Sequence, residues 1–284
     1  MNNQDMRLAV LIDADNVPRN SIKAIMKEIA VYGNPTIKRI YGDWTGPHIS
    51  GWKNSLLEHA ITPIQQYGYT VGKNSTDSAM IIDAMDILYR DNVDGFCIIS
   101  SDSDFTRLAL RLREAGMRVF GFGERKTPKP FVVACDRFIY IEVILDAANK
   151  AIEQIAAEQA AAELAVAKAA AQTKTVRKKT KSDSEAELKL NLTASPQNSY
   201  SDVVPDEVVE LIIASLADIA DDDGFAFLGA LGSLLGKKQP DFDPRNYGFA
   251  KLSSLIASIP RFEIKFRGSK DSSSKQLYIK DRHA

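Results

Sequence analysis

Short apolar runs alternate with longer amphipathic segments between residues 7 and 142. The runs have the length and continuous hydrophobicity of strands buried on both faces, and the segments between them repeat apolar positions at helical spacing. This alternation predicts an α/β domain over residues 1–145, with a parallel sheet that helices cover on both sides. The predicted strands are 7–13, 37–43, 62–68, 96–100, 117–123 and 137–142; the predicted helices are 18–33, 46–60, 75–90 and 104–115, with a helical turn at 131–135.

The pattern changes after residue 145. Residues 147–172 are rich in alanine, with Glu and Lys between the alanines, which predicts an exposed helix. Residues 173–202 contain few apolar and many polar side chains, so we expect residues 146–202 to combine this helix with a disordered linker. The basic stretch VRKKTK at 176–181 could contact RNA or could be an ordinary solvated linker.

A second compact unit is predicted over residues 203–284. Helical spacing recurs in three segments, and two alternating segments follow as strands joined by SKDSSS. Three helices and a two-stranded ribbon are the outline of a small α+β winged helix. The predicted helices are 203–220, 225–238 and 246–259, and the predicted strands are 262–268 and 275–281.

Composition adds limits on location and partners. The chain has 284 residues, is 45% hydrophobic and carries a formal net charge of −1, so any surface for nucleic acid must be local. Its two cysteines lie in apolar surroundings and suggest neither a disulfide framework nor a zinc site. The first residues do not resemble a signal peptide, and no apolar run has the length of a membrane span. We therefore expect a cytoplasmic protein.

Acidic side chains follow two of the predicted buried strands. Asp13 ends the strand 7–13, and Asp102 and Asp104 follow the strand 96–100 in the stretch IISSDSDF. In an open α/β sheet, ligands bind beyond the carboxyl ends of the strands, where the strand order reverses. We therefore expect the three carboxylates to lie at one edge of the sheet.

A fourth acid, Asp77, lies in the first turn of the predicted helix 75–90. Ile81, Ala84, Met85 and Leu88 follow it at helical spacing, which places Asp77 on the apolar face of that helix. An inward carboxylate is costly unless it is paired or binds a metal. Asp83 and Asp86 point elsewhere around the helix, and we expect them to be surface acids.

Clustered carboxylates indicate a divalent cation that prefers oxygen ligands, Mg²⁺ or Mn²⁺. The three histidines have no ligand spacing, and a histidine base is unsupported, although His48 in a loop stays open. Helix capping is the competing interpretation for several of these polar residues. Asp15 and Asn16, and the pair Ser101 and Asp104, fit caps; Asn74, Ser75 and Thr76 fit caps or phosphate contacts, and Lys73 fits a surface lysine or a phosphate ligand.

Three motifs together resemble the NYN domain, a branch of the PIN-like nuclease superfamily related to the LabA group. They are LIDADNV, the K-x-x-x-D of KNSTDSAMIIDAMDIL, and IISSDSDFTRLALRLREAGMRVFGFG, and they cover about residues 5–145. The resemblance implies a PIN-like, Rossmannoid α/β/α sandwich with a divalent-metal site that acts on RNA. It implies catalytic metal ligands at Asp13, Asp77, Asp102 and Asp104, and we expect substrate contacts from Asn16, Lys73 and Ser101.

The C-terminal unit resembles the OST-HTH or LOTUS domain in the stretch LGSLLGKKQPDFDPRNYGFAKLSSLIASIPRFEIK. The resemblance implies a winged helix that binds RNA or a protein partner. From residue 237 to the end, eleven Lys and Arg face five Asp and Glu, so a basic stripe for phosphate is one interpretation and a solvated surface the other. Tyr247 could stack on a base or belong to the core. The candidate RNA contacts are Lys237, Lys238, Arg245, Tyr247, Lys251, Lys265 and Arg267.

These features favour a metal-dependent ribonuclease, a hydrolase of RNA phosphodiesters, tethered to an RNA-binding LOTUS module and acting in RNA processing or decay. Two other functions stay open. One is a non-catalytic RNA-binding adaptor, in which the acids bind metal without hydrolysis. The other is a scaffold, in which the LOTUS module binds a protein partner.

Overall fold

The computed structural model describes residues 6–45, 51–67, 75–90, 92–154, 204–268 and 275–283. The predicted linker at 173–202 and its basic stretch lie outside these residues, as do Lys73, Asn74 and His48. No helix in the described part of the chain is long and apolar enough to cross a membrane.

The N-terminal part is built on a six-stranded parallel sheet in the order β3-β2-β1-β4-β5-β6. The predicted parallel α/β sandwich is therefore confirmed. Strand order reverses between β1 and β4, because β2 and β3 extend the sheet to one side of β1 and the later strands to the other. The strands are β1 (Arg7–Asp13), β2 (Asn34–Gly42), β3 (Thr62–Gln65), β4 (Gly95–Ile99), β5 (Arg118–Gly123) and β6 (Arg137–Tyr140).

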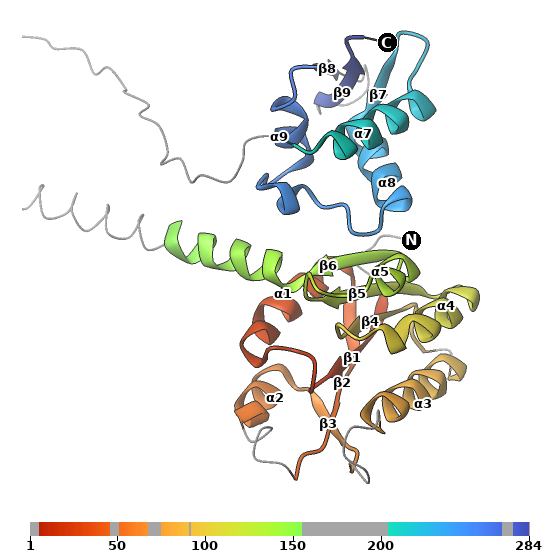
Figure 1. The fold of residues 1–284 in the computed structure, drawn as a ribbon, viewed down its shortest axis with the longest axis vertical. Helices are drawn as coiled ribbons and strands as arrows, with labels where there is room; N and C mark the ends of the chain where they lie inside the picture. The colour runs from red at the N-terminus through yellow and green to blue at the C-terminus, as the bar shows by residue number, and fades with distance from the viewer. Residues whose placement is uncertain are drawn as a thin grey trace, which may run out of the picture. The chain divides into compact units, whose positions relative to one another are not determined.

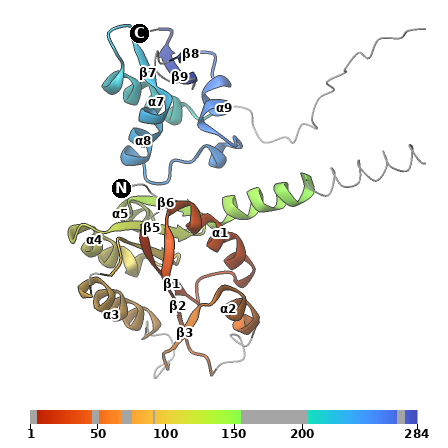
Figure 2. The same ribbon diagram turned by 180° about the vertical axis from the view of Figure 1, so that it is seen from behind.

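Helices cover both faces of this sheet (Figures 1 and 2). Alternate residues of each strand supply two separate cores, since successive side chains point to opposite faces. Val10 and Ile12 of β1 join the core under α1 and α2, whereas Ala9 and Leu11 join the core under α3, α4 and α5. The helices are α1 (Ile22–Tyr32), α2 (Lys53–His59), α3 (Ser75–Tyr89), α4 (Thr106–Glu114) and α5 (Lys129–Ala134), with short 3-10 turns η2 (Arg19–Ser21) and η4 (Ser103–Phe105).

A further helix covers residues 141–154. Its first turn is mostly buried, and its described residues from 151 onward are exposed, as expected for the start of the alanine-rich segment. The contacts group Met1–Asp146 with Val204–Ala284 as one compact unit.

The C-terminal part is a small winged helix with its own core around Ile212, Leu231, Leu255 and Ile279. Its three-stranded antiparallel sheet has the order β7-β9-β8. Its elements are α7 (Asp206–Ile219), β7 (Phe225–Phe227), α8 (Leu228–Lys238), η5 (Pro244–Tyr247), α9 (Leu252–Ala257), β8 (Phe262–Gly268) and β9 (Lys275–Asp281).

Two local predictions for this winged helix are wrong. Phe225–Phe227 begins the predicted second helix but forms a strand, because all three residues pair with β9. The predicted third helix, 246–259, is shorter: η5 ends at Tyr247, the following Gly248 has a left-handed φ of 85°, and α9 begins only at Leu252.

Candidate metal centre and basic module

Asp13 lies at the end of β1, on the face covered by α3. It continues the series of Ala9 and Leu11, which pack against that helix, and its side chain is 1% exposed. Asn16 Nδ2 donates to its Oδ2 over 2.7 Å, and the backbone N–H of Asp15 donates to its Oδ1 over 3.1 Å. Burial raises the pKa of Asp13, and these hydrogen bonds oppose that rise.

Ser100 connects this acid to the neighbouring strand. Its hydroxyl donates to Asp13 Oδ2 over 2.8 Å and accepts the backbone N–H of Asp102 over 3.1 Å. It follows Phe96 and Ile98 on the same face of β4, because strand residues alternate. Gly123 of β5 permits this packing, since a Cβ there would lie 2.7 Å from the Ser100 carbonyl oxygen. Ser100 was not among the predicted site residues.

Asp77 lies in the first turn of α3 and is 8% exposed, on the same face as the buried Met80 and Ala84. The prediction that it is an inward acid is confirmed. Burial raises its pKa to about 6, and the charges of Asp13, Asp102, Asp104 and Asp15 add to the rise. Without a cation, these acids therefore repel one another.

Asp102 and Asp104 follow β4 at the η4 turn. Asp102 caps this turn, accepting the backbone N–H of Asp104 over 2.9 Å. The predicted Ser101–Asp104 cap is not formed, because Ser101 Oγ instead accepts the backbone N–H of Glu124 over 2.9 Å. One carboxylate oxygen each from Asp77, Asp102 and Asp104 lies within 4.8 Å of the other two.

This donor set fits a hard divalent cation. Octahedral Mg²⁺ with bonds of about 2.1 Å holds its ligand oxygens about 3 Å apart when adjacent and about 4.2 Å apart when opposite. The three oxygens need only a small approach to reach that spacing. The raised pKa of Asp77 is a second sign of fit, because a cation would favour the ionised carboxylate that its neighbours disfavour.

The structure separates the described site residues into three acids with ligand spacing, one further acid beside them, and two polar residues that hydrogen-bond nearby. Asp77, Asp102 and Asp104 have ligand spacing, whereas Asp13 is outside that group of three but close enough for its charge to act on Asp77. Asn16 bonds to Asp13, and Ser101 bonds to the backbone beyond β5.

Asp15 and Thr76 also lie near the cluster; Asp15 was predicted only as a cap, and Thr76 only as a cap or a phosphate contact. Asp15 is exposed, its charge acts on Asp77, and its Oδ2 accepts the Thr76 hydroxyl over 3.3 Å. The stretch DAD at 13–15 was the available signal for this fifth acid, but a capping role explained it equally well.

One expectation about the α3 surface is wrong. Asp83 is half-buried, and its carboxylate accepts hydrogen bonds from Arg39 and from the Tyr41 hydroxyl, both on β2. Helical phase predicted its direction correctly, but the polar side chains of β2 that meet it could not be deduced from α3 alone. Asp86 is exposed, as predicted.

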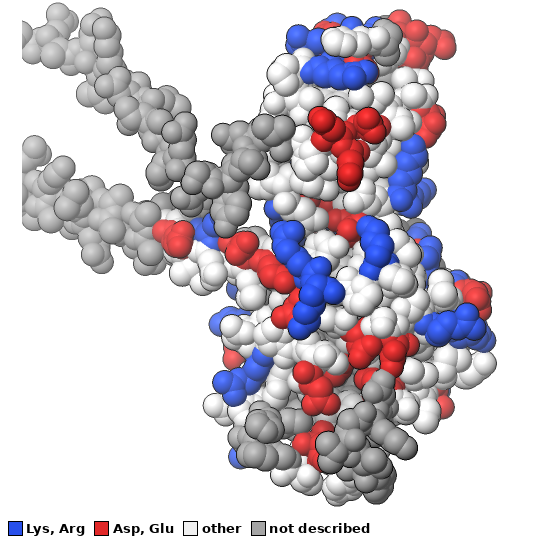
Figure 3. Space-filling model, viewed as in Figure 1, with Lys and Arg blue, Asp and Glu red and all other residues white. Residues whose placement is uncertain are grey.

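The predicted basic stripe of the C-terminal part is divided among local partners. Lys238 pairs with Asp218, and Lys265 pairs with Glu263. Arg267 pairs with Asp221 and Asp223, and its guanidinium carbon lies 4.6 Å from the ring centroid of Phe225. On the face in view in Figure 3, basic side chains of this module lie in separate groups with acidic ones between them.

The remaining candidates differ in exposure. Lys237 and Lys251 are exposed. Tyr247 is half-buried and packs with the core residue Phe242, with ring centroids 6.1 Å apart. Arg245 binds Glu28, outside its own module, and is treated below. The contacts with RNA stay predictions.

The chain was also compared with known proteins. A search of curated sequences found no match. Similar solved structures include a protein of unknown function from Vibrio parahaemolyticus, at 18% identity and TM-score 0.43, covering 50% of this chain and 96% of that one. They also include an uncharacterised protein from Nitrosomonas europaea, at 30% identity and TM-score 0.25, covering 36% and 92%. A protein fragment from Chromobacterium violaceum is 29% identical, with TM-score 0.24, covering 30% and 88%.

Family models identify both parts of the chain. The model of the NYN domain matches residues 7–142, and the model of the OST-HTH/LOTUS domain matches residues 201–273. The six-stranded parallel sheet and the small winged helix agree with these matches. The chain therefore carries a NYN domain over residues 7–142, followed by an OST-HTH/LOTUS domain over residues 201–273.

Proposed function

We propose that this protein is a divalent-metal-dependent RNA phosphodiesterase that acts in the cytoplasm, with its LOTUS domain as an RNA-binding module. One observation carries the proposal: three carboxylates with ligand spacing lie at the strand-order reversal of a NYN-domain sheet. Ligands bind at that point in open α/β sheets, and oxygen-only donor sets suit Mg²⁺ or Mn²⁺.

The acids have distinct roles in this proposal. Asp77, Asp102 and Asp104 would hold the cation. Asp13, which accepts hydrogen bonds from Asn16 and Ser100, would add a further negative charge next to them. The bound cation would polarise the scissile phosphate and lower the pKa of an attacking water. Because Asp102 also caps η4, its carboxylate is held in a fixed direction before any cation binds.

The LOTUS domain would act through local concentration. Binding of RNA to one domain raises the concentration of that RNA at the other, so weak contacts at each are sufficient together. Its exposed Lys237 and Lys251 are the first candidates for phosphate contact.

The test follows an end-labelled pool of single-stranded and structured RNA with Mn²⁺, Mg²⁺ or EDTA. Wild type is compared with Asp102→Asn and with the matched control Asp86→Asn, an exposed acid on α3. We expect cleavage by wild type and by the control, and loss of cleavage in EDTA and in Asp102→Asn.

Intact RNA in every lane would contradict the catalytic proposal, as would cleavage by Asp102→Asn at the wild-type rate. Metal-dependent RNA binding without cleavage would instead support the adaptor. Absence of RNA binding even at low salt would support a protein-binding scaffold.

A further inference from the structure

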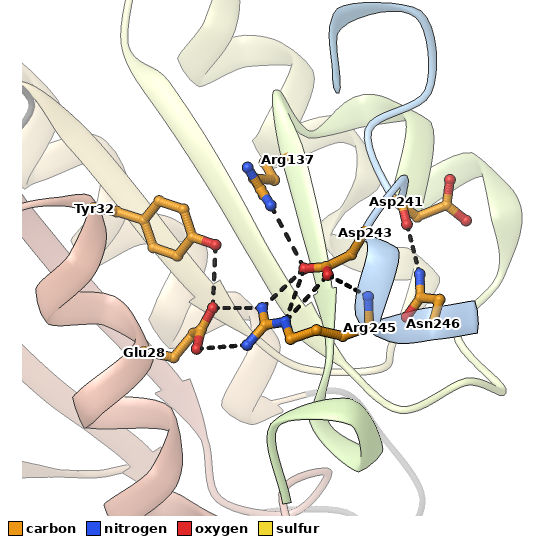
Figure 4. A network of polar contacts seen from close by, with 7 residues as sticks. All are labelled: Glu28, Tyr32, Arg137, Asp241, Asp243, Arg245 and Asn246. Atoms are coloured by element: carbon orange, nitrogen blue, oxygen red, sulfur yellow. Dashed lines mark hydrogen bonds and ion pairs between the residues drawn. The ribbon is translucent and has the colours of Figure 1, made fainter. Parts of the chain in front are cut away.

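The loop from Pro240 to Tyr247 joins α8 to α9 in the LOTUS domain and contacts the NYN domain (Figure 4). We propose that this loop is a docking element that binds the outer edge of the NYN-domain sheet in the same chain. Its partner surface is formed by α1, α5 and β6, through Glu28, Lys129, Arg137, Phe138 and Tyr140. The proposal is independent of whether the acidic site cleaves RNA.

Arg245 is the central contact of the loop. Its Nη1 and Nη2 donate to the two carboxylate oxygens of Glu28 over 3.0 and 2.7 Å, a bidentate pair. Its Nε and Nη2 also bond to Asp243 within the loop, over 2.8–3.2 Å. The guanidinium is therefore oriented by its own domain before it meets Glu28, which lowers the entropy that docking costs.

Two acids of the loop face bases of the NYN domain. Asp243 is 7% exposed and lies 3.5 Å from Arg137, whose guanidinium packs over the ring of Tyr32. Asp241 is 9% exposed; its Oδ2 accepts the Tyr140 hydroxyl over 2.9 Å and lies 3.5 Å from Lys129. Its Oδ1 is buried without a hydrogen-bond partner among the described residues, so Asp241 is the weaker anchor.

The charges of the two sides are complementary. Glu28 meets Arg245, Arg137 meets Asp243, and Lys129 meets Asp241, so three acids are opposed by three bases. Burial alone would raise the pKa of Asp243, but hydrogen bonds from Arg245 and the charge of Arg137 hold it below its usual value. A buried carboxylate without such partners would be costly, so this pairing fits a specific contact rather than a chance approach.

A backbone contact completes the surface. Strand β6 is the edge of the sheet, so one side of it has no neighbouring strand. The backbone N–H of Phe138 donates to the carbonyl of Pro240 over 2.9 Å. The loop thus covers an edge that would otherwise present an unpaired donor.

This assignment changes the role of two predicted RNA contacts. Arg245 has a side chain 24% exposed and is committed to Glu28 and Asp243. The pKa of the half-buried Tyr247 is raised chiefly by burial and also by the charge of Asp241. While the loop is docked, the Arg245 guanidinium is not available to RNA, whereas the half-buried Tyr247 ring is partly accessible.

Hydrogen exchange of the Phe138 amide in the full-length chain tests the docking. We expect slow exchange in wild type and much faster exchange in Glu28→Arg, because a base would then face Arg245. The matched control is Glu58→Arg, the same substitution at a 60% exposed surface ion pair with Lys23. Circular dichroism and the Tm of each variant show whether the NYN domain is still folded.

A second pair of variants makes the result independent of the charge reversal. Glu28→Gln and Arg245→Gln should each speed exchange, and the double variant should add little to either, because both remove one contact. An unprotected Phe138 amide in wild type would overturn the proposal, as would equal protection in all variants or fully additive effects. Protection that falls on dilution would place the contact between two copies and would overturn the same-chain assignment.

Discussion

At the residue scale, Asp77 connects the packing of α3 to the chemistry of the acidic cluster. Its position on the apolar face buries a carboxylate, and four other acids act on it. The raised pKa therefore reports a repulsion that folding imposes and that a cation would relieve. Stability and metal binding should thus respond in opposite directions to the removal of this charge.

Asp77→Asn should stabilise the metal-free protein at pH 8 by about 1–2 kcal/mol, less than the full pKa shift implies, because salt screens part of the repulsion among the acids. The folded pKa of Asp77, about 6, lies above the ordinary aspartate pKa of 3.8, so ionisation of Asp77 weakens the fold as pH rises through the range from about 4 to about 6. The gain should shrink as pH falls from about 6 and vanish below about 4. Urea unfolding in EDTA at each pH measures it.

Asp86→Asn is the control for this series, because Asp86 is an exposed acid on the same helix. A gain for Asp77→Asn that does not depend on pH would show that ionisation is not its cause. With saturating Mg²⁺, wild type should recover stability by binding the ion, whereas Asp77→Asn should recover less.

At the element scale, the sequence predicted every strand of the NYN-domain sheet and the edge at which its acids meet. Period and phase were sufficient for this, since they also placed Asp77 inward. Phase could not identify what a side chain meets, so Asp83 was expected at the surface although Tyr41 and Arg39 bind it. The choice between Ser100 and Ser101 depended on the exact residue at which β4 ends, which sequence patterns define poorly.

The strand β7 was mistaken for the start of a helix because the apolar residues of FAFLGALGSLL fit both the two-residue repeat of a strand and the 3.6-residue repeat of a helix. Its formation depends on a partner, β9, more than fifty residues later in the chain. Local propensity cannot report such a pairing.

A pair of substitutions tests how deeply the two phenylalanines of β7 are buried. Phe225→Ala should destabilise the chain by about 3–4 kcal/mol, because Phe225 is buried and packs under Lys265, Arg267 and Lys280. Phe227→Ala should cost less than about 1.5 kcal/mol, because Phe227, two residues further along the strand, is 40% exposed. Urea unfolding of both variants measures the difference, and equal losses would contradict the difference in burial between the two rings.

At the scale of the whole molecule, the polar residues of the LOTUS domain have two different roles: contact with the NYN domain and ion pairing within the wing. The loop 240–247 is used against the NYN domain, and the basic residues of the wing are paired with neighbouring acids. Lys237 and Lys251 are exposed and lie outside the loop 240–247. RNA binding, if it follows the proposed function, should therefore depend on these lysines more than on Arg245.

The salt dependence of RNA affinity can measure this division. Each phosphate contact on single-stranded RNA contributes about 0.7 to the slope of log K against log salt. The double variant Lys237→Gln/Lys251→Gln should lower the slope by about 1.4 if both lysines contact phosphate. Arg245→Gln should leave it unchanged, since a side chain bound to Glu28 and Asp243 releases no counterion when RNA binds. Fluorescence anisotropy with a labelled RNA over a salt series gives both slopes.

A lower slope for Arg245→Gln would mean that the loop leaves the NYN domain to bind RNA. The NYN domain and RNA would then compete for the loop.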